Sequence, residues 1–135
     1  MKITSVIVAV IGLSLLASCS HEGSKKVVKE YASISFTSIS KDIGTVVLGT
    51  SKELSFYAIN KSDTPLIIDS VKSSCSCTVS KFPKKPILKN DSGLIVATYT
   101  PNKTNVGYLE KSIVVLSNTK PAFTVLSFSG TVTVE

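Results

Sequence analysis

Two cysteines lie one residue apart in the middle of the chain, within Ser73-Ser74-Cys75-Ser76-Cys77-Thr78. Thiols at this spacing could form a strained, easily reduced disulfide, or bind a soft metal ion such as Cu(I). If the segment is one regular strand, both thiols share a face and behave as small core side chains. A turn or bulge at Ser73-Ser74 would interrupt the alternation of side chains along the strand and could expose both sulfur atoms. The spacing alone leaves these interpretations open.

The rest of the chain offers this pair few chemical partners. The third cysteine is Cys19 and the one histidine is His21, both near the start of the chain. A closed zinc site needs four ligands, and thiol catalysis usually needs a histidine base. We therefore expect no catalytic centre, no cofactor and no bound metal ion. A redox or copper(I)-handling role for Cys75 and Cys77 is the alternative hypothesis.

A second candidate site is the segment Phe82-Pro83-Lys84-Lys85-Pro86, which joins an aromatic residue to two lysines. Its two prolines restrict the backbone, which lowers the conformational entropy lost when a loop docks. The loop could therefore present Phe82, Lys84 and Lys85 to a partner protein. The simpler interpretation is a rigid connection between two strands.

The first residues have the composition of an export signal. Lys2 precedes a mainly apolar run over residues 3–16, and Leu16-Ala17-Ser18-Cys19 closes it. Such a run is too short for a comfortable membrane span and is typical of a signal peptide. The four closing residues resemble the bacterial lipobox. That resemblance implies cleavage before Cys19, diacylglycerol on its sulfur and an acyl chain, such as palmitate, on its amine.

These features divide the chain into three parts. We expect a lipoprotein signal peptide over residues 1–18, a lipidated tether over 19–32 and a single domain over 33–135. The protein would then be held in the cell envelope by the lipid on Cys19, with another envelope protein as its partner. In Bacteroidetes lipoproteins, an acidic run after the cysteine favours export to the cell surface. This tether has no such run, which favours the periplasmic face of the outer membrane.

The charge of the chain does not indicate nucleic-acid binding. The formal net charge is +6, and every basic residue is a lysine. Arginine is the residue that reads phosphate and guanine through paired hydrogen bonds. No stripe of aromatic residues is interleaved with the lysines, as a platform for single strands would require. We therefore exclude nucleic acid as a partner.

The mature part of the chain consists of short strand-like runs. They are rich in Val, Ile, Thr and aromatic residues and are separated by Gly, Pro, Asn and Asp. The clearest runs are 34–36, 43–48, 52–60, 65–71, 94–99, 111–116 and 123–134. Residues 52–60 place Leu54, Phe56 and Ala58 on one face. The pattern predicts an all-β fold, an immunoglobulin-like antiparallel β-sandwich of about seven to eight strands.

A closed barrel is the alternative to this sandwich. Residues 61–63 and 101–106, however, have the composition of loops that connect the two sheets at the ends of a sandwich. The disulfide-and-tryptophan core of antibody domains does not apply, because the chain has no tryptophan. We therefore expect an immunoglobulin-like sandwich without that disulfide.

The order of motifs resembles an immunoglobulin-like domain family of unknown function that is abundant in Bacteroidetes lipoproteins. The matching motifs are Asp42-Ile43-Gly44-Thr45, Phe56 to Asn60, Pro65 to Ile68, Cys75-Ser76-Cys77-Thr78, Pro86-Ile87, Gly107-Tyr108 and Ser112 to Asn118. Ser76 replaces the glycine of the family's Cys-Gly-Cys-Thr signature, and Lys89-Asn90 replaces a Pro-Gly pair. The family is similar in turn to abnormal-spindle and hydin-type sandwiches. The resemblance implies a partner-binding fold and no catalytic centre.

Overall fold

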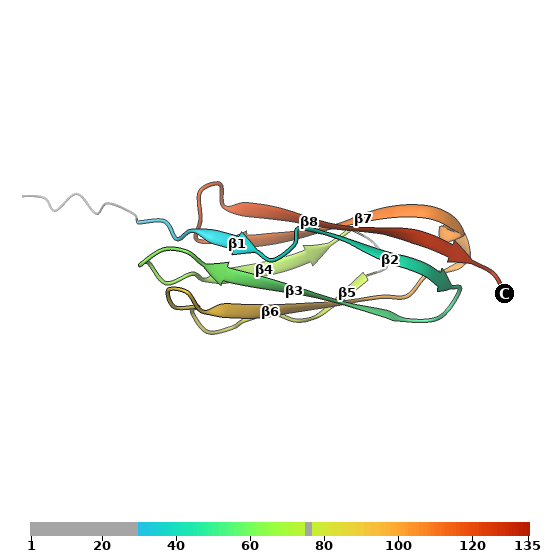
Figure 1. Ribbon diagram of the computed structural model, residues 1–135, viewed down its shortest axis with the longest axis horizontal. Coiled ribbons are helices and arrows are strands. Elements are labelled where there is room, and N and C mark those ends of the chain that lie inside the picture. The colour runs from blue at the N-terminus through green and yellow to red at the C-terminus, as the bar shows by residue number, and fades with distance from the viewer. Residues whose placement is uncertain (1–29, 75–76) are drawn as a thin grey trace, which may run out of the picture.

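The structure is a computed structural model that describes residues 30–74 and 77–135, with the backbone alone for residues 77–80. The described residues form two four-stranded sheets, ordered β1-β3-β6-β5 and β2-β8-β7-β4, which face each other as two layers (Figure 1). The elements are β1 (Ile34–Phe36), β2 (Ser40–Val47), β3 (Lys52–Asn60), β4 (Ile68–Ser73), β5 (Cys77–Lys81), β6 (Ser92–Tyr99), the 3₁₀ helix η1 (Lys103–Asn105), β7 (Gly107–Ser117) and β8 (Phe123–Thr133). The predicted all-β sandwich is confirmed.

One strand pair corrects the expectation of a purely antiparallel fold. β1 pairs antiparallel with β3, whereas β2 pairs parallel with β8 in the opposite sheet. β1 and β2 run in the same direction, because the chain crosses between the sheets at residues 37–39 without reversing. Each of the six later connections, from β2 to β8, reverses the chain, and an even number of reversals leaves β8 running the same way as β2 (Figure 1). The sequence pattern does not predict the parallel pairing of β2 with β8, because the spacing of apolar residues shows which face of a strand is buried and not which strand lies beside it.

The motif Asp42-Ile43-Gly44-Thr45 forms a bulge in β2. The register with β8 shifts between Asp42 and Thr45, and Gly44 has a φ of 67°. The Gly44 N–H donates a hydrogen bond to Asp42 Oδ1 at 2.7 Å. Opposite the bulge, a Cβ on Gly130 would lie 2.5 Å from Ile43 Cγ1. The two glycines thus allow the bulge to form and Ile43 to be buried beneath it.

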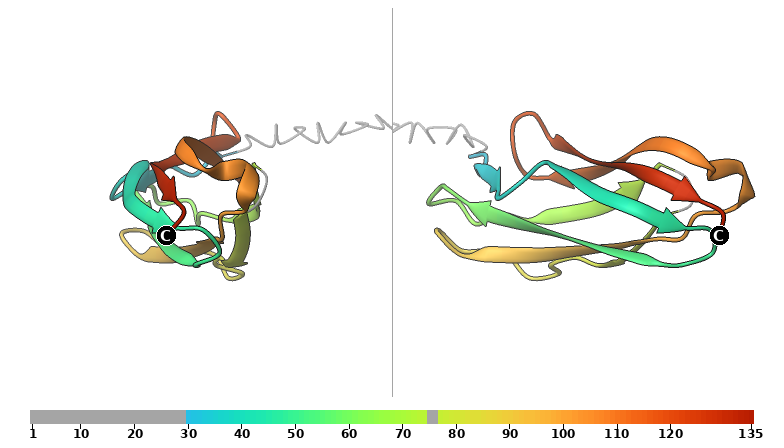
Figure 2. Two further views of the ribbon diagram at one scale, coloured as in Figure 1. Left: turned by 90° about the vertical axis from the view of Figure 1, so that its right-hand side faces the viewer. Right: turned by 45° about the vertical axis from the view of Figure 1, so that its right-hand side comes forward.

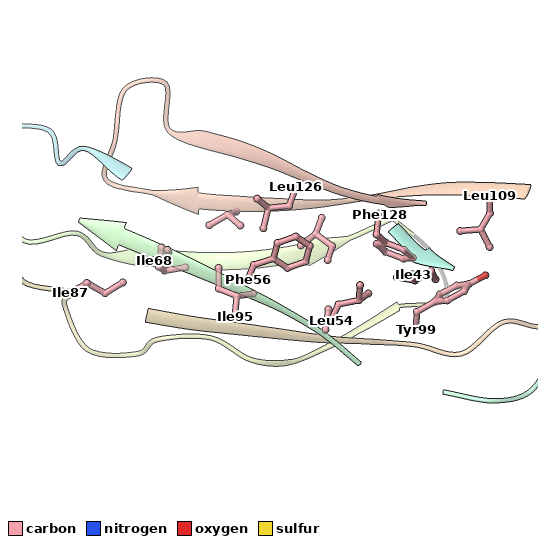
Figure 3. Packing of buried hydrophobic residues seen from close by; sticks show 14 of the residues in the cluster. Ile43, Leu54, Phe56, Ile68, Ile87, Ile95, Tyr99, Leu109, Leu126 and Phe128 are labelled. Carbon is pink, nitrogen blue, oxygen red and sulfur yellow. The ribbon is translucent and has the colours of Figure 1, made fainter. Parts of the chain in front are cut away.

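The core lies between the two sheets along the length of the sandwich (Figure 3). Leu54, Phe56 and Ala58 all point into it, which confirms the predicted face of β3. The rings of Tyr99 and Phe128 meet across the sheets with their centroids 5.3 Å apart. A continuous core of this kind fixes the sheets rigidly, so the loops at the two ends keep defined positions.

The loops gather at opposite ends of the sandwich (Figure 2). We call the end built from residues 31–33, 61–67, 88–91 and 118–122 the N-terminal end, because the chain enters the fold there. The far end carries residues 48–51 and 100–106. Residues 61–63 and 101–106 thus lie in connections between the sheets, as predicted. Ala32, which the sequence assigned to the tether, is buried and forms a β-bridge with Thr119.

Candidate functional site

The candidate partner segment lies between β5 and β6, and we call residues 81–91 the lysine loop. β5 and β6 pair in one sheet, so the loop leaves and re-enters the same edge of the sandwich. A groove with a volume of about 560 Å³ lies between residues 81–87 and the start of β6 at residues 91–93. The predicted loop therefore forms one wall of a surface groove.

The first half of the loop lies directly on β6. Phe82 is half-buried and packs against the hydrophobic core. A Cβ on Gly93 would lie 2.3 Å from Pro83 Cγ and 2.6 Å from Ile87 Cδ1. Real Cβ atoms are never found so close to a neighbour, so only glycine lets the loop approach the strand. Sequence reasoning missed Gly93, because its role depends on a contact between separate segments.

The second half of the loop is attached to the connection between β3 and β4. The Ile87 N–H donates to the Leu66 carbonyl oxygen at 2.8 Å, and the Leu66 N–H donates back to the Ile87 carbonyl at 2.9 Å. Both side chains are buried. This short bridge links the lysine loop, which returns to its own sheet, to the connection that crosses from β3 to β4 in the other sheet, so the groove wall is held from both sides.

Asn60 joins these two loops from the end of β3. It is completely buried, and its Nδ2 donates hydrogen bonds of 2.9 Å to the carbonyl oxygens of Thr64 and Ile87. Its Oδ1 accepts hydrogen bonds from the Ser62 N–H at 2.9 Å and the Ser62 hydroxyl at 2.8 Å. All four hydrogen-bonding positions of the amide are therefore used. The sequence showed Asn60 as a motif residue, but its partners lie on loops that periodicity does not position.

The loop departs from the resembled family at Lys89-Asn90, and the structure shows how it folds there. Asn90 has a φ of 65°, a conformation that favours glycine but that asparagine tolerates. The Asn90 N–H donates to the Asn60 carbonyl at 2.9 Å, and the Asp91 N–H donates to the Leu88 carbonyl at 3.0 Å. Asparagine thus occupies a tight-turn position that favours glycine.

The exposed surface of the lysine loop is basic. Lys81, Lys84 and Lys85 are exposed, and Asp91 is the acidic residue that lines the groove. Lys84 Nζ lies 3.4 Å from the centroid of the Phe82 ring, within the range of a cation–π interaction. The ring therefore holds one ammonium group over the loop while the other two extend into solvent.

This arrangement changes the expected role of Phe82. The sequence suggested that the loop could present Phe82 to a partner. Phe82 instead packs against the core on one side and lies under Lys84 on the other. The residue anchors the loop, and the surface that another molecule can reach consists mainly of Lys84 and Lys85.

The cysteine pair falls where the chain passes between the sheets. β4 ends at Ser73 in one sheet, and β5 begins at Cys77 in the other. Cys75 lies outside the described residues, and for Cys77 the backbone alone is described. Residues 73–77 therefore do not belong to one regular strand. The alternation of side chains that would place both thiols on one face does not apply. The disulfide, copper and core interpretations of Cys75 and Cys77 stay predictions.

All four described edge strands have features that hinder pairing with another chain. β1 has three residues and β5 has five. The pairings of three edge strands, β5, β2 and β4, also each have a register shift, at 79–81, 42–45 and 68–70 respectively. Short or bulged edges are the means by which natural sandwiches prevent strand addition. The loops are therefore better candidates for a binding surface than the edges.

The described part of the chain has neither a cluster of metal ligands nor a membrane-spanning helix. Within residues 30–74 and 77–135, no three His, Cys, Asp or Glu residues lie close enough together to hold a metal ion. No helix in those residues has the length and apolar character needed to span a membrane. Cys19 lies outside them, so its lipidation stays a prediction.

Solved structures show where this fold occurs. A protein of unknown function from Porphyromonas gingivalis W83 matches with a TM-score of 0.66 and 15% identity, over 76% of this chain and 48% of that chain. The chain thus spans about half the length of that protein. The ASH/PapD-like domain 7 of human CEP192 matches with a TM-score of 0.62 and 12% identity, over 78% of this chain and 88% of that one. The likeness to the PapD-like domain confirms an immunoglobulin-like sandwich.

A third match carries an enzymatic name. The secreted serine protease VesC from Vibrio cholerae matches with a TM-score of 0.57 and 11% identity, over 76% of this chain but 23% of that chain. At this identity the likeness concerns the fold alone, so protease activity is not transferred.

The family of the chain follows from its sequence. No curated protein matches it. The model of the family described as "Protein of unknown function (DUF1573)" matches residues 34–132, which extend from the start of β1 almost to the end of β8. The chain therefore belongs to the DUF1573 family of proteins of unknown function.

Proposed function

We propose that this protein is a lipid-anchored component of the cell envelope whose sandwich is a non-enzymatic binding module. The binding surface is the lysine loop, and its partner is an acidic segment of another envelope protein. The observation that carries the proposal is a basic loop held rigidly over a groove, with Lys81, Lys84 and Lys85 exposed along it.

The rigidity of the loop favours binding. Phe82, Pro83 and Ile87 attach it to the core, to β6 and to the β3–β4 connection. A loop that is already ordered loses little conformational entropy when a partner docks. The same charges on a disordered segment would bind more weakly. The loop therefore has the organisation of a recognition surface.

The charge of the loop indicates the chemistry of the partner. Three exposed lysines face the groove region, against the single carboxylate of Asp91 in its lining. Such a surface attracts acidic groups, increases the association rate and disfavours basic partners. Lysine ammonium groups act as point charges, so an extended run of Asp and Glu suits them well.

Anchoring is supported by the sequence. The apolar run over residues 3–16 and the closing Leu16-Ala17-Ser18-Cys19 have the pattern of a lipoprotein signal. A lipidated Cys19 would place the binding loop close to a membrane and to other envelope proteins. The wild type should float with membranes, and mass spectrometry should show diacylglycerol and an acyl chain on Cys19 that are absent from a Cys19→Ser variant. An unmodified Cys19 in the membrane-bound protein would contradict the anchor.

The alternative role in redox chemistry or copper(I) handling has no comparable support. No observation on the described residues favours a reactive state of Cys77, and Cys75 lies outside them. That alternative is therefore not part of the proposal.

Site-specific photo-cross-linking in intact cells tests the binding loop. A benzoylphenylalanine residue is introduced at Lys85 in the full-length protein, and the control carries it at Lys103 in η1 at the far end. Irradiation should give one dominant cross-linked protein from position 85 and little from position 103. Equal yields from the two positions, or no product from position 85, would refute the proposed surface.

A further inference from the structure

The N-terminal end carries a cluster of exposed apolar side chains that protein binding through Lys81, Lys84 and Lys85 does not explain. Phe123 is 52% exposed, Leu88 58%, and Tyr31 and Ile67 43% each. These residues come from four separate segments that lie together at one end of the sandwich. The Ile67 N–H donates to Asn118 Oδ1 at 2.8 Å, and Lys120 Nζ lies 5.9 Å from the Tyr31 ring centroid. The segments converge at the left of Figure 1, where the chain enters the fold.

From these observations we infer that the N-terminal end rests on the membrane surface, with Tyr31, Ile67, Leu88 and Phe123 contacting the headgroup region. This inference rests on the proposed lipid anchor and adds a second contact between the protein and the lipid. Aromatic and aliphatic side chains at loop tips suit the boundary between headgroups and acyl chains.

The length of the tether supports this orientation. Residues 19–30 separate the proposed lipid on Cys19 from Tyr31. Even fully extended, a segment of that length reaches at most about 40 Å. The anchor therefore keeps the N-terminal end near the bilayer, where a weak contact benefits from a high effective concentration.

The charges of this end do not oppose the contact. Lys61, Lys89 and Lys120 are balanced by Glu30, Asp63 and Asp91, and Lys89 is paired with Asp63 at 2.7 Å. A balanced surface can approach zwitterionic lipid without repulsion. We therefore expect the apolar side chains to provide most of the contact, even in membranes without anionic lipid.

The far end provides a matched comparison. It also exposes large apolar side chains, with Tyr108 73% exposed near the start of β7. Apolar exposure alone therefore does not distinguish the two ends. The distinguishing feature is the point where the tether joins the fold, because it brings one end to the membrane and keeps the other away.

Tryptophan fluorescence tests this inference without background, because the chain contains no tryptophan. The full-length lipidated variants Phe123→Trp and Tyr108→Trp are reconstituted separately into vesicles of phosphatidylcholine and phosphatidylethanolamine. Some of the phosphatidylcholine carries a spin label near its headgroup. The tryptophan at position 123 should be quenched several-fold more strongly than that at 108, and its emission should shift to shorter wavelength. Leu88→Trp should behave like Phe123→Trp and provides a second site if the first variant folds poorly.

Several outcomes would overturn the inference, and they are distinguishable. If the protein floats with the vesicles but both tryptophans are equally accessible to water, the contact is absent and the anchor stands. If the protein does not float with the vesicles, both the lipid anchor and the membrane contact are refuted. If position 123 is shielded in native envelopes but not in vesicles, the surface binds a protein and not lipid.

Discussion

The two ends of the sandwich are held together in different ways. At the N-terminal end, hydrogen bonds join segments that are far apart in sequence, such as Asn60 to Ile87 and Asn118 to Ile67. At the far end, the Gly49 N–H donates to the Pro101 carbonyl oxygen at 3.1 Å and the Ser51 and Thr100 hydroxyls lie 2.8 Å apart, but the segment around η1 is closed by its own residues. Asn102 Oδ1 accepts from the Thr104 N–H at 3.0 Å, and Asn105 Oδ1 accepts from the Asn102 N–H at 3.1 Å.

This contrast shows where the fold requires a fixed surface. Loops linked to one another cannot move separately, so the N-terminal end and the lysine loop behave as one body. A loop closed by local bonds can change without disturbing its neighbours. Both proposed surfaces, for a protein and for lipid, lie on the cross-linked side of the molecule. Paired substitutions at the two ends can test this difference.

The largest effect is expected at Asn60. Asn60→Ala removes four hydrogen bonds at a completely buried site. The carbonyls of Ile87 and Thr64 each keep one donor, from the Leu66 N–H and the Ser62 hydroxyl, but the Ser62 N–H loses its acceptor. We expect the free energy of unfolding to fall by about 3–5 kcal/mol, because each lost hydrogen bond costs about 1 kcal/mol and an unsatisfied polar group costs more. The matched change Asn102→Ala removes a helix cap at the far end and should cost about 1 kcal/mol. Urea denaturation measures the free energy of unfolding of both variants. Equal losses of stability in the two variants would contradict the difference between the ends.

A smaller effect is expected at Gly93. A methyl group there would lie 2.3 Å from Pro83 Cγ, so Gly93→Ala must push the lysine loop away from β6. We expect a loss of about 2 kcal/mol and a lower cross-linking yield from position 85. Gly107→Ala is the control, because it has open space but a φ of 102°, and should cost about 1 kcal/mol. Thermal unfolding together with the cross-linking yield measures both effects. An unchanged yield in Gly93→Ala would show that β6 does not position the loop.

The smallest effect is expected at the ion pair between Lys89 and Asp63. The two groups are 2.7 Å apart, but their side chains are 52% and 84% exposed. Lys89→Ala should change the stability by less than about 0.5 kcal/mol, because solvent screens exposed pairs. Denaturation at low and high salt provides the measurement. A loss comparable with that of Gly93→Ala would mean that the charge pair, and not the buried contacts, holds the loops together.

Local patterns predicted much of the fold. The alternation of Leu54, Phe56 and Ala58 was sufficient to define β3 and its buried face, because side chains in a strand alternate. The loops at 61–63 and 101–106 were found from their polar and turn-forming residues. Partner strands were harder to predict. The parallel pairing of β2 with β8 and the separation of β4 from β5 depend on contacts between distant residues, which no local period reports.

The candidate site could be predicted only in part, because some of its features depend on contacts between distant residues. The lysines and prolines of residues 82–86 identify a stiff basic loop from composition alone. The burial of Phe82 depends on the neighbouring core, and the need for glycine at position 93 depends on Pro83. The role of Asn60 depends on two loops meeting at the end of β3. These features arise only when the chain is folded, so a single sequence does not show them.

The most direct test of the central claim compares equal charge changes on the loop and elsewhere. Lys84→Glu with Lys85→Glu reverses the lysine loop, whereas Lys72→Glu with Lys103→Glu makes the same net change on edge strand β4 and at the far end. Because position 85 is substituted, each full-length variant carries benzoylphenylalanine at the exposed groove residue Lys81 instead, and the yield of the complex first identified from position 85 is measured in the native envelope. We expect the loop variant to lose most of this complex and the control to keep it. Equal loss in both variants, or retention in the loop variant, would contradict the proposal that the lysine loop binds the partner.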